Sequence, residues 1–284
     1  ARELFSQGCV ELNLIGQDTT SYGHDIGDRG GLVGMLEALD REAASHGGAW
    51  IRLMYAYPSK FTDEMIDAFA RLPNLLPYID MPLQHASDRM LTAMRRQTTA
   101  RAQRALLERL RARVPGMAVR TTFITGFPGE REEDHRELLD FVREMRFEMM
   151  GVFRYSREDH TPAGTMDEDP GLHVPDEIKA QREEELMLAQ QEIAFDRART
   201  QAESRHQVEV LIDAAAPGRS RARRTSGVSR GGELYQGRTA FQAPTIDSVT
   251  WVMSAEPRSP GEIVRCTIVD ADGYDLVAQP SEDL

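Results

Sequence analysis

The sequence predicts an α/β fold in which a partial parallel (β/α) barrel is followed by a small all-β barrel. Between residues 10 and 155, apolar runs of strand length alternate with segments of helical period, as in a parallel sheet built from βα units. After residue 205 the pattern changes to short β-like segments separated by Gly and Pro turns. We therefore expect a barrel domain at 1–173, a connecting helix at 174–205 and a β-barrel domain at 206–284.

Five strands are expected in the first domain, because five short runs are rich in apolar and β-branched residues. They are 10–15, 50–55, 78–83, 119–124 and 149–155. The segment 32–45 carries apolar residues on one helical face, and Thr62 is placed to cap a helix that ends before Pro73. Ser87 is placed to cap another, which a second helix follows as far as Pro115, and a further helix is expected after Glu130, running to about Met145.

The remaining chain predicts one long helix and a small barrel. Pro175 begins a charged helix that we expect to run to about Glu203, with its apolar residues used in ordinary packing: Leu186, Leu188, Ile193 and Phe195. A five-stranded barrel is expected next, with strands recognised at 208–212, 249–253, 263–269 and 274–277. The basic cluster Arg219, Arg221, Arg223 and Arg224 is interpreted as a solvated loop rather than an RNA contact.

Composition limits the class of protein. The net charge of -12 has the wrong sign for binding phosphate backbones, so RNA is disfavoured and a protein partner is favoured. No apolar run could span a bilayer and the first residues do not resemble a secretory signal, which predicts a cytoplasmic protein without a membrane segment. The two cysteines, Cys9 and Cys266, have no pairing framework and are expected to be buried, inert thiols.

Polar residues follow the predicted strands, where the carboxyl ends of parallel strands form the active sites of such barrels. They are Gln17, Asp18 and Thr19; Gln84 and His85; Thr125, Gly126 and Glu130; and Tyr155, Ser156 and Arg157. Asp18 and Thr19 fit a capped loop equally well, and Asp80 fits a hydrogen-bonded core carboxylate equally well. The position of His85 favours function over a structural role, although a structural histidine is the commoner case.

Several segments resemble, in order, those of radical S-adenosylmethionine methylthiotransferases, and the resemblance covers essentially the whole chain. They are 11–23, 50–58, 80–85, 94–96 and 121–130, followed by a terminal module that resembles a TRAM domain. Gln17-Asp18-Thr19-Thr20 and Asp80-Met81-Pro82-Leu83-Gln84-His85 resemble the ribosomal-protein branch (RimO-like) more than the transfer-RNA branch (MiaB-like). Residues 206–284 hold 8 basic against 11 acidic residues, net -3, which suits a basic ribosomal protein.

The resemblance implies a transferase that adds a methylthio group to the β-carbon of an aspartate in ribosomal protein S12 of the small subunit. It also implies S-adenosylmethionine, 4Fe-4S clusters and an electron donor protein. In the family three cysteines hold the radical cluster and an amino-terminal domain carries a second one, whereas this chain has two isolated cysteines. The sequence is therefore expected to be a truncated part of the enzyme, without the amino-terminal domain and cluster cysteines and inactive without them.

Residue roles are carried over from the matching positions, and no catalytic or metal-binding residue is assigned. The resemblance implies cofactor contacts at Gln84, His85, Phe123, Thr125, Gly126 and Phe127, and substrate contacts at Gln17, Asp18, Thr19 and Arg120. A tRNA methylthiotransferase and a non-catalytic module that binds a ribosomal protein remain alternatives. A hydrolase with a metal on Asp80 and His85 is the weakest, because no further ligand stands at suitable spacing.

Overall fold

The computed structural model of the protein describes residues 1–216 and 232–283. The chain forms two compact units, one of Ala1–Gln7 with Glu11–Gln190 and one of Gly8–Val10 with Gln191–Leu284. The division falls inside the long helix α8 (Asp176–Glu203), so each unit takes one part of that helix. The domain boundaries expected at 173 and 205 lie on either side of this division.

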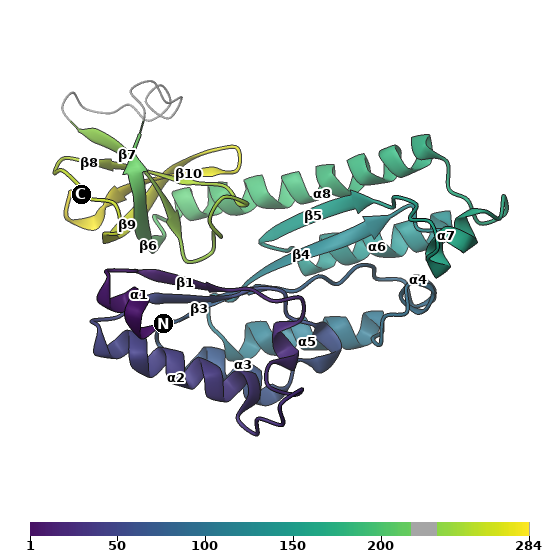
Figure 1. Ribbon diagram of the computed structural model, residues 1–284. Helices are drawn as coiled ribbons and strands as arrows, with labels where there is room; N and C mark the ends of the chain where they lie inside the picture. The colour runs from purple at the N-terminus through teal and green to yellow at the C-terminus, as the bar shows by residue number, and fades with distance from the viewer. Residues whose placement is uncertain (217–231, 284) are drawn as a thin grey trace. The chain divides into compact units, whose positions relative to one another are not determined.

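The first unit is built on a five-stranded parallel sheet in the order β1-β2-β3-β4-β5 (Figure 1). The strands are β1 (Glu11–Leu14), β2 (Trp50–Leu53), β3 (Leu75–Asp80), β4 (Ala118–Thr125) and β5 (Met149–Arg154). Each strand pairs in parallel with the next strand along the chain, which requires a crossover connection between them. The predicted partial parallel barrel is therefore confirmed as an open sheet with helical crossovers.

Helices fill these crossovers, and Figure 1 shows α2, α3 and α5 along one side of the sheet. The helices of this unit are α1 (Arg2–Ser6), α2 (Gly31–Ser45), α3 (Asp63–Arg71), α4 (Asp88–Ala93), α5 (Ala100–Arg113), α6 (Glu132–Met145) and α7 (Pro162–Asp167), with short 3-10 turns at Thr19–Ser21 and Pro58–Lys60. Thr62 caps α3 as predicted, since its hydroxyl accepts a hydrogen bond from Met65 N at 3.3 Å. The helix α7 was not predicted.

Two local predictions near β3 were wrong. The strand begins at Leu75, not at Tyr78, because Leu75 already pairs with Ile51. It ends at Asp80, since Pro82 has no N–H with which to continue a regular ladder. Ser87 occupies the cap position of α4 but does not cap it: its hydroxyl donates to Asp134 Oδ1 at 2.7 Å instead.

The alternation of β4 decides which side chains face the helices. Phe123 is fully buried and contacts the rings of Phe141 and Phe147, with centroids 6.4 and 5.7 Å away. Thr122 and Ile124 point to the opposite face, because successive strand residues alternate, and both are half-buried. One face of the sheet is therefore packed core, and the other carries the partly accessible side chains.

The second unit contains a closed barrel in the order β10-β8-β7-β6-β9. Its strands are β6 (Gln207–Ala215), β7 (Glu233–Thr239), β8 (Thr250–Ser254), β9 (Ile263–Asp272) and β10 (Asp275–Pro280), and a short 3-10 turn follows at Ser281–Asp283. The predicted five-stranded barrel is confirmed, but β7 escaped recognition. Gly237 interrupts its apolar pattern because a Cβ there would lie 2.6 Å from Leu211 O on the neighbouring strand.

Other expectations meet mixed outcomes. Cys266 is buried as expected, and burial raises the pKa of its thiol to about 12, but Cys9 is only partly buried. In α8, Leu186 and Ile193 are buried, whereas Leu188 and Phe195 are 52% and 39% exposed. The arginines at 219, 221, 223 and 224 lie outside the described residues. 

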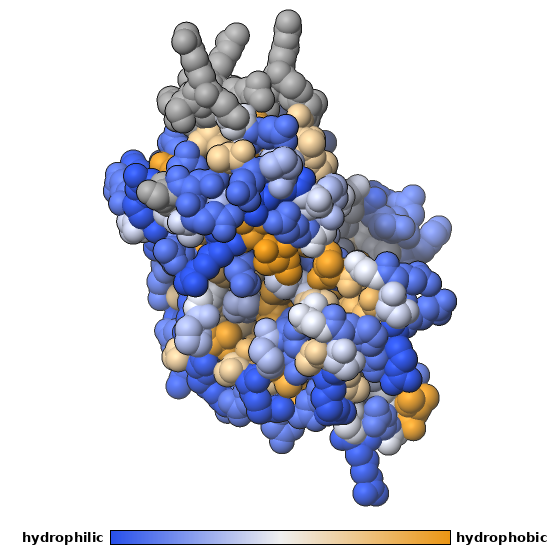
Figure 2. Space-filling model, turned by 90° about the vertical axis from the view of Figure 1, so that its left-hand side faces the viewer, coloured by the Kyte–Doolittle hydropathy of each residue, from blue (hydrophilic) through white to orange (hydrophobic). Residues whose placement is uncertain are grey.

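The surface agrees with the charged composition. Figure 2 shows hydrophilic residues over most of the visible face, with apolar residues between them. Within residues 1–216 and 232–283, no helix combines the length and apolar character needed to traverse a bilayer.

Candidate functional site

The loop after β1 is tied to the loop after β2 by Thr19 and Asp18. The Thr19 hydroxyl donates to Met54 O at 2.9 Å, and Thr19 itself is buried. The Asp18 carboxylate accepts hydrogen bonds from Lys60 Nζ and Ser21 Oγ, both at 2.7 Å, and from the Thr20 hydroxyl. Burial alone would raise the pKa of Asp18, but these hydrogen bonds and the Lys60 charge lower it to about 2.

These contacts fit the capped-loop interpretation of Asp18 and Thr19. Both side chains form hydrogen bonds within the protein, whereas the neighbouring Gln17 is exposed. Their predicted role in substrate binding stays a prediction, and of the three only Gln17 offers a freely accessible side chain there.

The chain after β3 runs beside β4 and places Gln84 and His85. Gln84 has a positive φ of 72°, and its backbone bonds Thr122 O and Ile124 N, both at 2.9 Å. His85 is fully buried; its Nδ1 accepts from the backbone N–H groups of Ala86 and Ser87, both at 2.9 Å. The proton of a neutral His85 therefore lies on Nε2, which is 3.5 Å from Glu130 Oε1.

Glu130 is the centre of this group. Its carboxylate is fully buried and accepts from Gly126 N, and Thr125 Oγ1 lies 3.5 Å away. Arg182 from α8 supplies the opposite charge, with Nη1 3.4 Å from Glu130 Oε2. The strand-end pattern included Glu130 without assigning it a role, and Arg182 was missed, because nothing local to either residue indicates the pairing.

Two features require a glycine at position 126: its backbone conformation and the close approach of a side chain from α8. Its φ is 71°, and a Cβ at this position would lie 2.2 Å from Lys179 Cγ. Lys179 Nζ lies 5.6 Å from the ring centroid of Tyr155, whose ring in turn contacts that of Phe127. The first turns of α8 therefore cover the loops that follow β4 and β5.

Most of the predicted cofactor-binding side chains are buried in the protein interior. Phe123, Thr125 and His85 are fully buried, and Phe127 is 7% exposed. Only Gln84 keeps a half-buried side chain, so direct cofactor contacts at the other positions would have to come from backbone atoms. The cofactor-binding assignment stays a prediction.

Arg120 and Asp80 form an ion pair across β4 and β3, with Arg120 Nη1 3.1 Å from Asp80 Oδ1. Asp80 is 1% exposed, which matches the hydrogen-bonded core carboxylate that the sequence allowed. Among the described residues no three His, Cys, Asp or Glu side chains are grouped to hold a metal ion. A hydrolytic metal centre on Asp80 and His85 has no support here.

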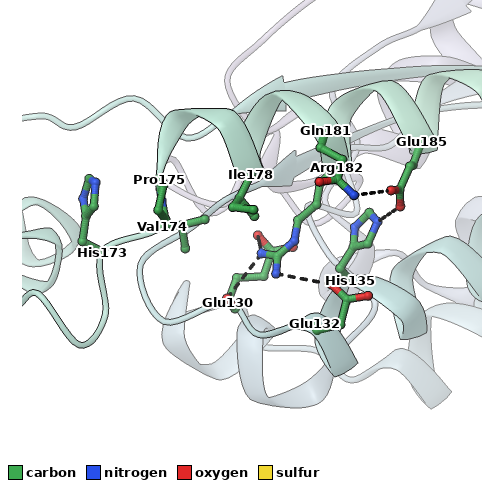
Figure 3. Close-up of a pocket in the computed structure, with 10 residues that line it drawn as sticks. All are labelled: Glu130, Glu132, His135, His173, Val174, Pro175, Ile178, Gln181, Arg182 and Glu185. Atoms are coloured by element: carbon green, nitrogen blue, oxygen red, sulfur yellow. Dashed lines mark hydrogen bonds and ion pairs between the residues drawn. The ribbon is translucent and has the colours of Figure 1, made fainter.

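A cavity of about 260 Å³ lies on the other side of Glu130, between α6 and the start of α8 (Figure 3). It is lined by Glu130, Glu132, His135, His173, Val174, Pro175, Ile178, Gln181, Arg182 and Glu185. Across it, His135 Nε2 is 2.8 Å from Glu185 Oε2, and Arg182 reaches towards Glu130 and Glu132. The cavity is smaller than pockets that enclose drug-sized ligands, and its charges are already paired.

Two family models match the sequence. That of the Radical SAM superfamily matches residues 1–142, which is half of the 284 residues and includes β1 to β4 with the loops described above. The chain belongs to the radical SAM superfamily. The TRAM domain model matches residues 206–280, which contain the closed barrel. The predicted radical-SAM-type sheet and TRAM-like barrel are therefore both confirmed.

Several curated relatives of this radical SAM chain share a name. "Ribosomal protein uS12 methylthiotransferase RimO" of Anaeromyxobacter sp. (strain Fw109-5) is 44% identical over 98% of this chain and 54% of its own length. The protein of that name from Desulforudis audaxviator is 41% identical over 98% of this chain and 57% of its own. The predicted resemblance to the ribosomal-protein branch is confirmed. The chain spans little more than half the length of these relatives.

Among solved structures, the radical S-adenosylmethionine methyltransferase TsrM from Kitasatospora setae is similar in fold. The alignment covers 57% of this chain and 31% of the TsrM chain. The identity is 19% and the TM-score 0.45, too low for an argument about function.

Proposed function

We propose that this chain is part of a methylthiotransferase that adds a methylthio group to the β-carbon of an aspartate in ribosomal protein uS12. The observation that carries the proposal is the 41–44% identity, over 98% of the chain, to relatives that bear this name. It is supported by the order of the two matched domains, with the radical SAM region first and the TRAM domain second.

The charge of the barrel supports a basic protein as substrate. Residues 206–284 contain 8 arginines and no lysine against 11 acidic residues, a net charge of -3 without histidine. A net negative charge disfavours the phosphates of RNA and favours a basic protein. This favours ribosomal protein over transfer RNA as the substrate class.

The open face of the sheet supports binding of S-adenosylmethionine. A Cβ added at Gly151 on β5 would meet nothing within 4 Å, and Gly151 pairs with Thr122 of β4. Next along the strands, half-buried Ile124 pairs with Phe153, which is 64% exposed. A glycine beside apolar side chains lets a flat ring approach the sheet.

When bound, the cofactor would supply the one-electron chemistry needed to replace a C–H bond. Gln84 and Thr122 would offer polar groups to it, and Ile124 and Phe153 would exclude water from its apolar part.

The 284 residues do not fit the ligation of an iron-sulfur cluster. Cluster irons are held by several thiolates, and this sequence has two cysteines. Cys266 is buried with a thiol pKa raised to about 12, so it resists forming a thiolate. The proposed reaction therefore requires cluster ligands outside these residues.

Mass spectrometry of uS12 tests the proposal. Deleting the gene that encodes this chain should remove the methylthio group from uS12, and restoring the gene should return it. The methylthio content of transfer RNA from the same cells should stay unchanged. Loss of a methylthio group from transfer RNA alone would overturn the proposal in favour of the transfer-RNA alternative. Binding of uS12 with no change in its mass would favour a non-catalytic binding module.

A further inference from the structure

The cavity between α6 and the start of α8 contains two buried polar atoms without a hydrogen-bond partner. Within the described residues these atoms are Nδ1 of His135 and Nε of Arg182. Both side chains line the cavity, and the two residues are 1% and 6% exposed. Buried polar atoms in native proteins are almost always satisfied by the protein, by water or by a ligand. Two such atoms in one cavity therefore indicate a site for a polar molecule.

The two side chains lie next to each other because α8 holds both. His135 comes from α6, and its Nε2 is 2.8 Å from Glu185 Oε2 on α8. Arg182 precedes Glu185 by three positions, and residues three apart are neighbours on a helix surface. Figure 3 shows the ring of His135 beside the side chain of Arg182. One small molecule can therefore reach both residues.

The two unpartnered atoms have opposite hydrogen-bonding roles. Because the Glu185 carboxylate accepts from Nε2 of His135, the proton of the neutral imidazole lies there and Nδ1 presents a lone pair. The Nε–H of Arg182 can only donate. A molecule that satisfies both atoms needs one donor and one acceptor close together. A primary carboxamide carries that pair on a single planar group.

The charges around the cavity favour a neutral ligand. Arg182 already pairs with Glu130 at 3.4 Å, and His135 bonds Glu185. The side chains of Glu132 and Glu185 are 54% and 40% exposed, so water solvates them. The rest of the lining includes three apolar residues at the start of α8 and just before it: Val174, Pro175 and Ile178. This combination suits a neutral molecule with an apolar body and a polar head.

We propose that this cavity binds a small neutral carboxamide. Its N–H would donate to Nδ1 of His135, its carbonyl would accept from Nε of Arg182, and its apolar part would contact Ile178. The volume of about 260 Å³ is far above the roughly 10–15 Å³ that one water needs and below the range of about 300–1,000 Å³ typical of drug-sized pockets. Because Arg182 also binds Glu130, the ligand would hold in place the arginine that supports the loops after β3 and β4.

The test follows the ring nitrogens of the histidines by NMR at neutral pH, in the full chain labelled with ¹⁵N-histidine. His135→Phe identifies the Nδ1 signal of His135 by its loss and keeps an aromatic ring in the cavity. Titration of the wild-type chain with benzamide should move that signal in a saturable way, because Nδ1 gains a hydrogen bond. Acetophenone keeps the ring and the carbonyl without the N–H groups, and benzylamine replaces the amide with a cation.

A larger saturable shift with benzamide than with acetophenone or benzylamine supports the site. Three results would overturn it: an equal response to acetophenone, which indicates apolar insertion alone; a larger response to benzylamine, which indicates a cation site; and no response to benzamide, which indicates a cavity that holds only water. This comparison uses the wild-type chain, so it stands even if a variant fails to fold.

Calorimetry of variants locates the binding. His135→Phe should weaken the binding of benzamide about tenfold or more, because the amide N–H loses its acceptor. Ile178→Ala should also weaken it by removing apolar contact. His206→Phe replaces an exposed histidine just before β6 and should leave the affinity unchanged. Wild-type affinity in both cavity variants would place the ligand elsewhere and contradict the proposal.

Discussion

Arg182 and Glu130 are 52 residues apart in sequence, yet Arg182 Nη1 lies 3.4 Å from Glu130 Oε2 and 3.3 Å from Glu130 O. Both side chains are almost completely withdrawn from solvent, at 8% and 0% exposure. Because Glu130 also holds Gly126 N and faces His85, this ion pair connects α8 to the loops after β3 and β4. The first turns of α8 are therefore part of the wall behind the candidate site.

Arg182→Met should lower the free energy of unfolding by about 3 kcal/mol, because it leaves the Glu130 carboxylate buried without its cation. The measurement is urea unfolding followed by circular dichroism. Arg136→Met is the control: its pair with Glu132 is exposed and should contribute less than about 0.5 kcal/mol. Similar losses in the two variants would mean that the buried pair does not hold the loop.

Gly126→Ala should destabilise the chain by about 2–3 kcal/mol, since the new Cβ collides with Lys179 Cγ and the φ of 71° is unfavourable. Adding Lys179→Ala should recover the part due to the collision and leave about 1 kcal/mol from the backbone. Gly116→Ala provides the comparison, because Gly116 has a φ of 73° with nothing within 4 Å. Thermal unfolding of these three variants and the wild type separates the two effects. A double variant no more stable than Gly126→Ala would contradict the collision.

Asp18 should contribute stability that disappears in acid. Its pKa is lowered to about 2 in the folded chain, so the contribution is present above the unfolded pKa of ~3.9 and is lost as pH falls through about 2. Asp18→Asn should lower the free energy of unfolding at neutral pH by about 1 kcal/mol, a modest value because Lys60 is 46% exposed.

Urea unfolding at pH values between neutrality and 2 would measure this contribution. The difference between wild type and Asp18→Asn should shrink towards the acid end. Asp25→Asn, at an exposed position, should follow the wild type throughout. A difference that grows on acidification would reverse the assigned sign.

Phe123→Ala should lower the free energy of unfolding by about 3–5 kcal/mol, because it empties the centre of a buried aromatic cluster. Phe153→Ala, on β5 at 64% exposure, should change it by less than about 0.5 kcal/mol. Both values come from equilibrium unfolding. A small effect at Phe123 would indicate that its ring is available to a ligand after all.

The sequence by itself determined most of the secondary structure, the parallel arrangement of the first sheet and the nature of the second barrel. Those features follow from local rules: Thr62 caps a helix within three residues of itself, and apolar periodicity separates strands from helices. The same residues placed the candidate site at the strand ends, since parallel strands share one carboxyl edge. The strand β7 was not recognised in the sequence, because Gly237 interrupts its apolar pattern. A glycine is needed there because the neighbouring strand approaches too closely for a Cβ.

Only the tertiary structure decided what each side chain at that edge does. In the folded chain Phe123 points into the core, Asp18 binds Lys60, and Arg182 is the cation that pairs with Glu130. The fold also leaves His135 Nδ1 and Arg182 Nε without a hydrogen-bond partner in the described chain. These choices connect residues tens of positions apart, and they depend on how crossover helices pack on the sheet. Local propensity cannot predict that packing. An arginine in a helical segment is compatible with any exposed position, and only the tertiary fold places a buried carboxylate beside it.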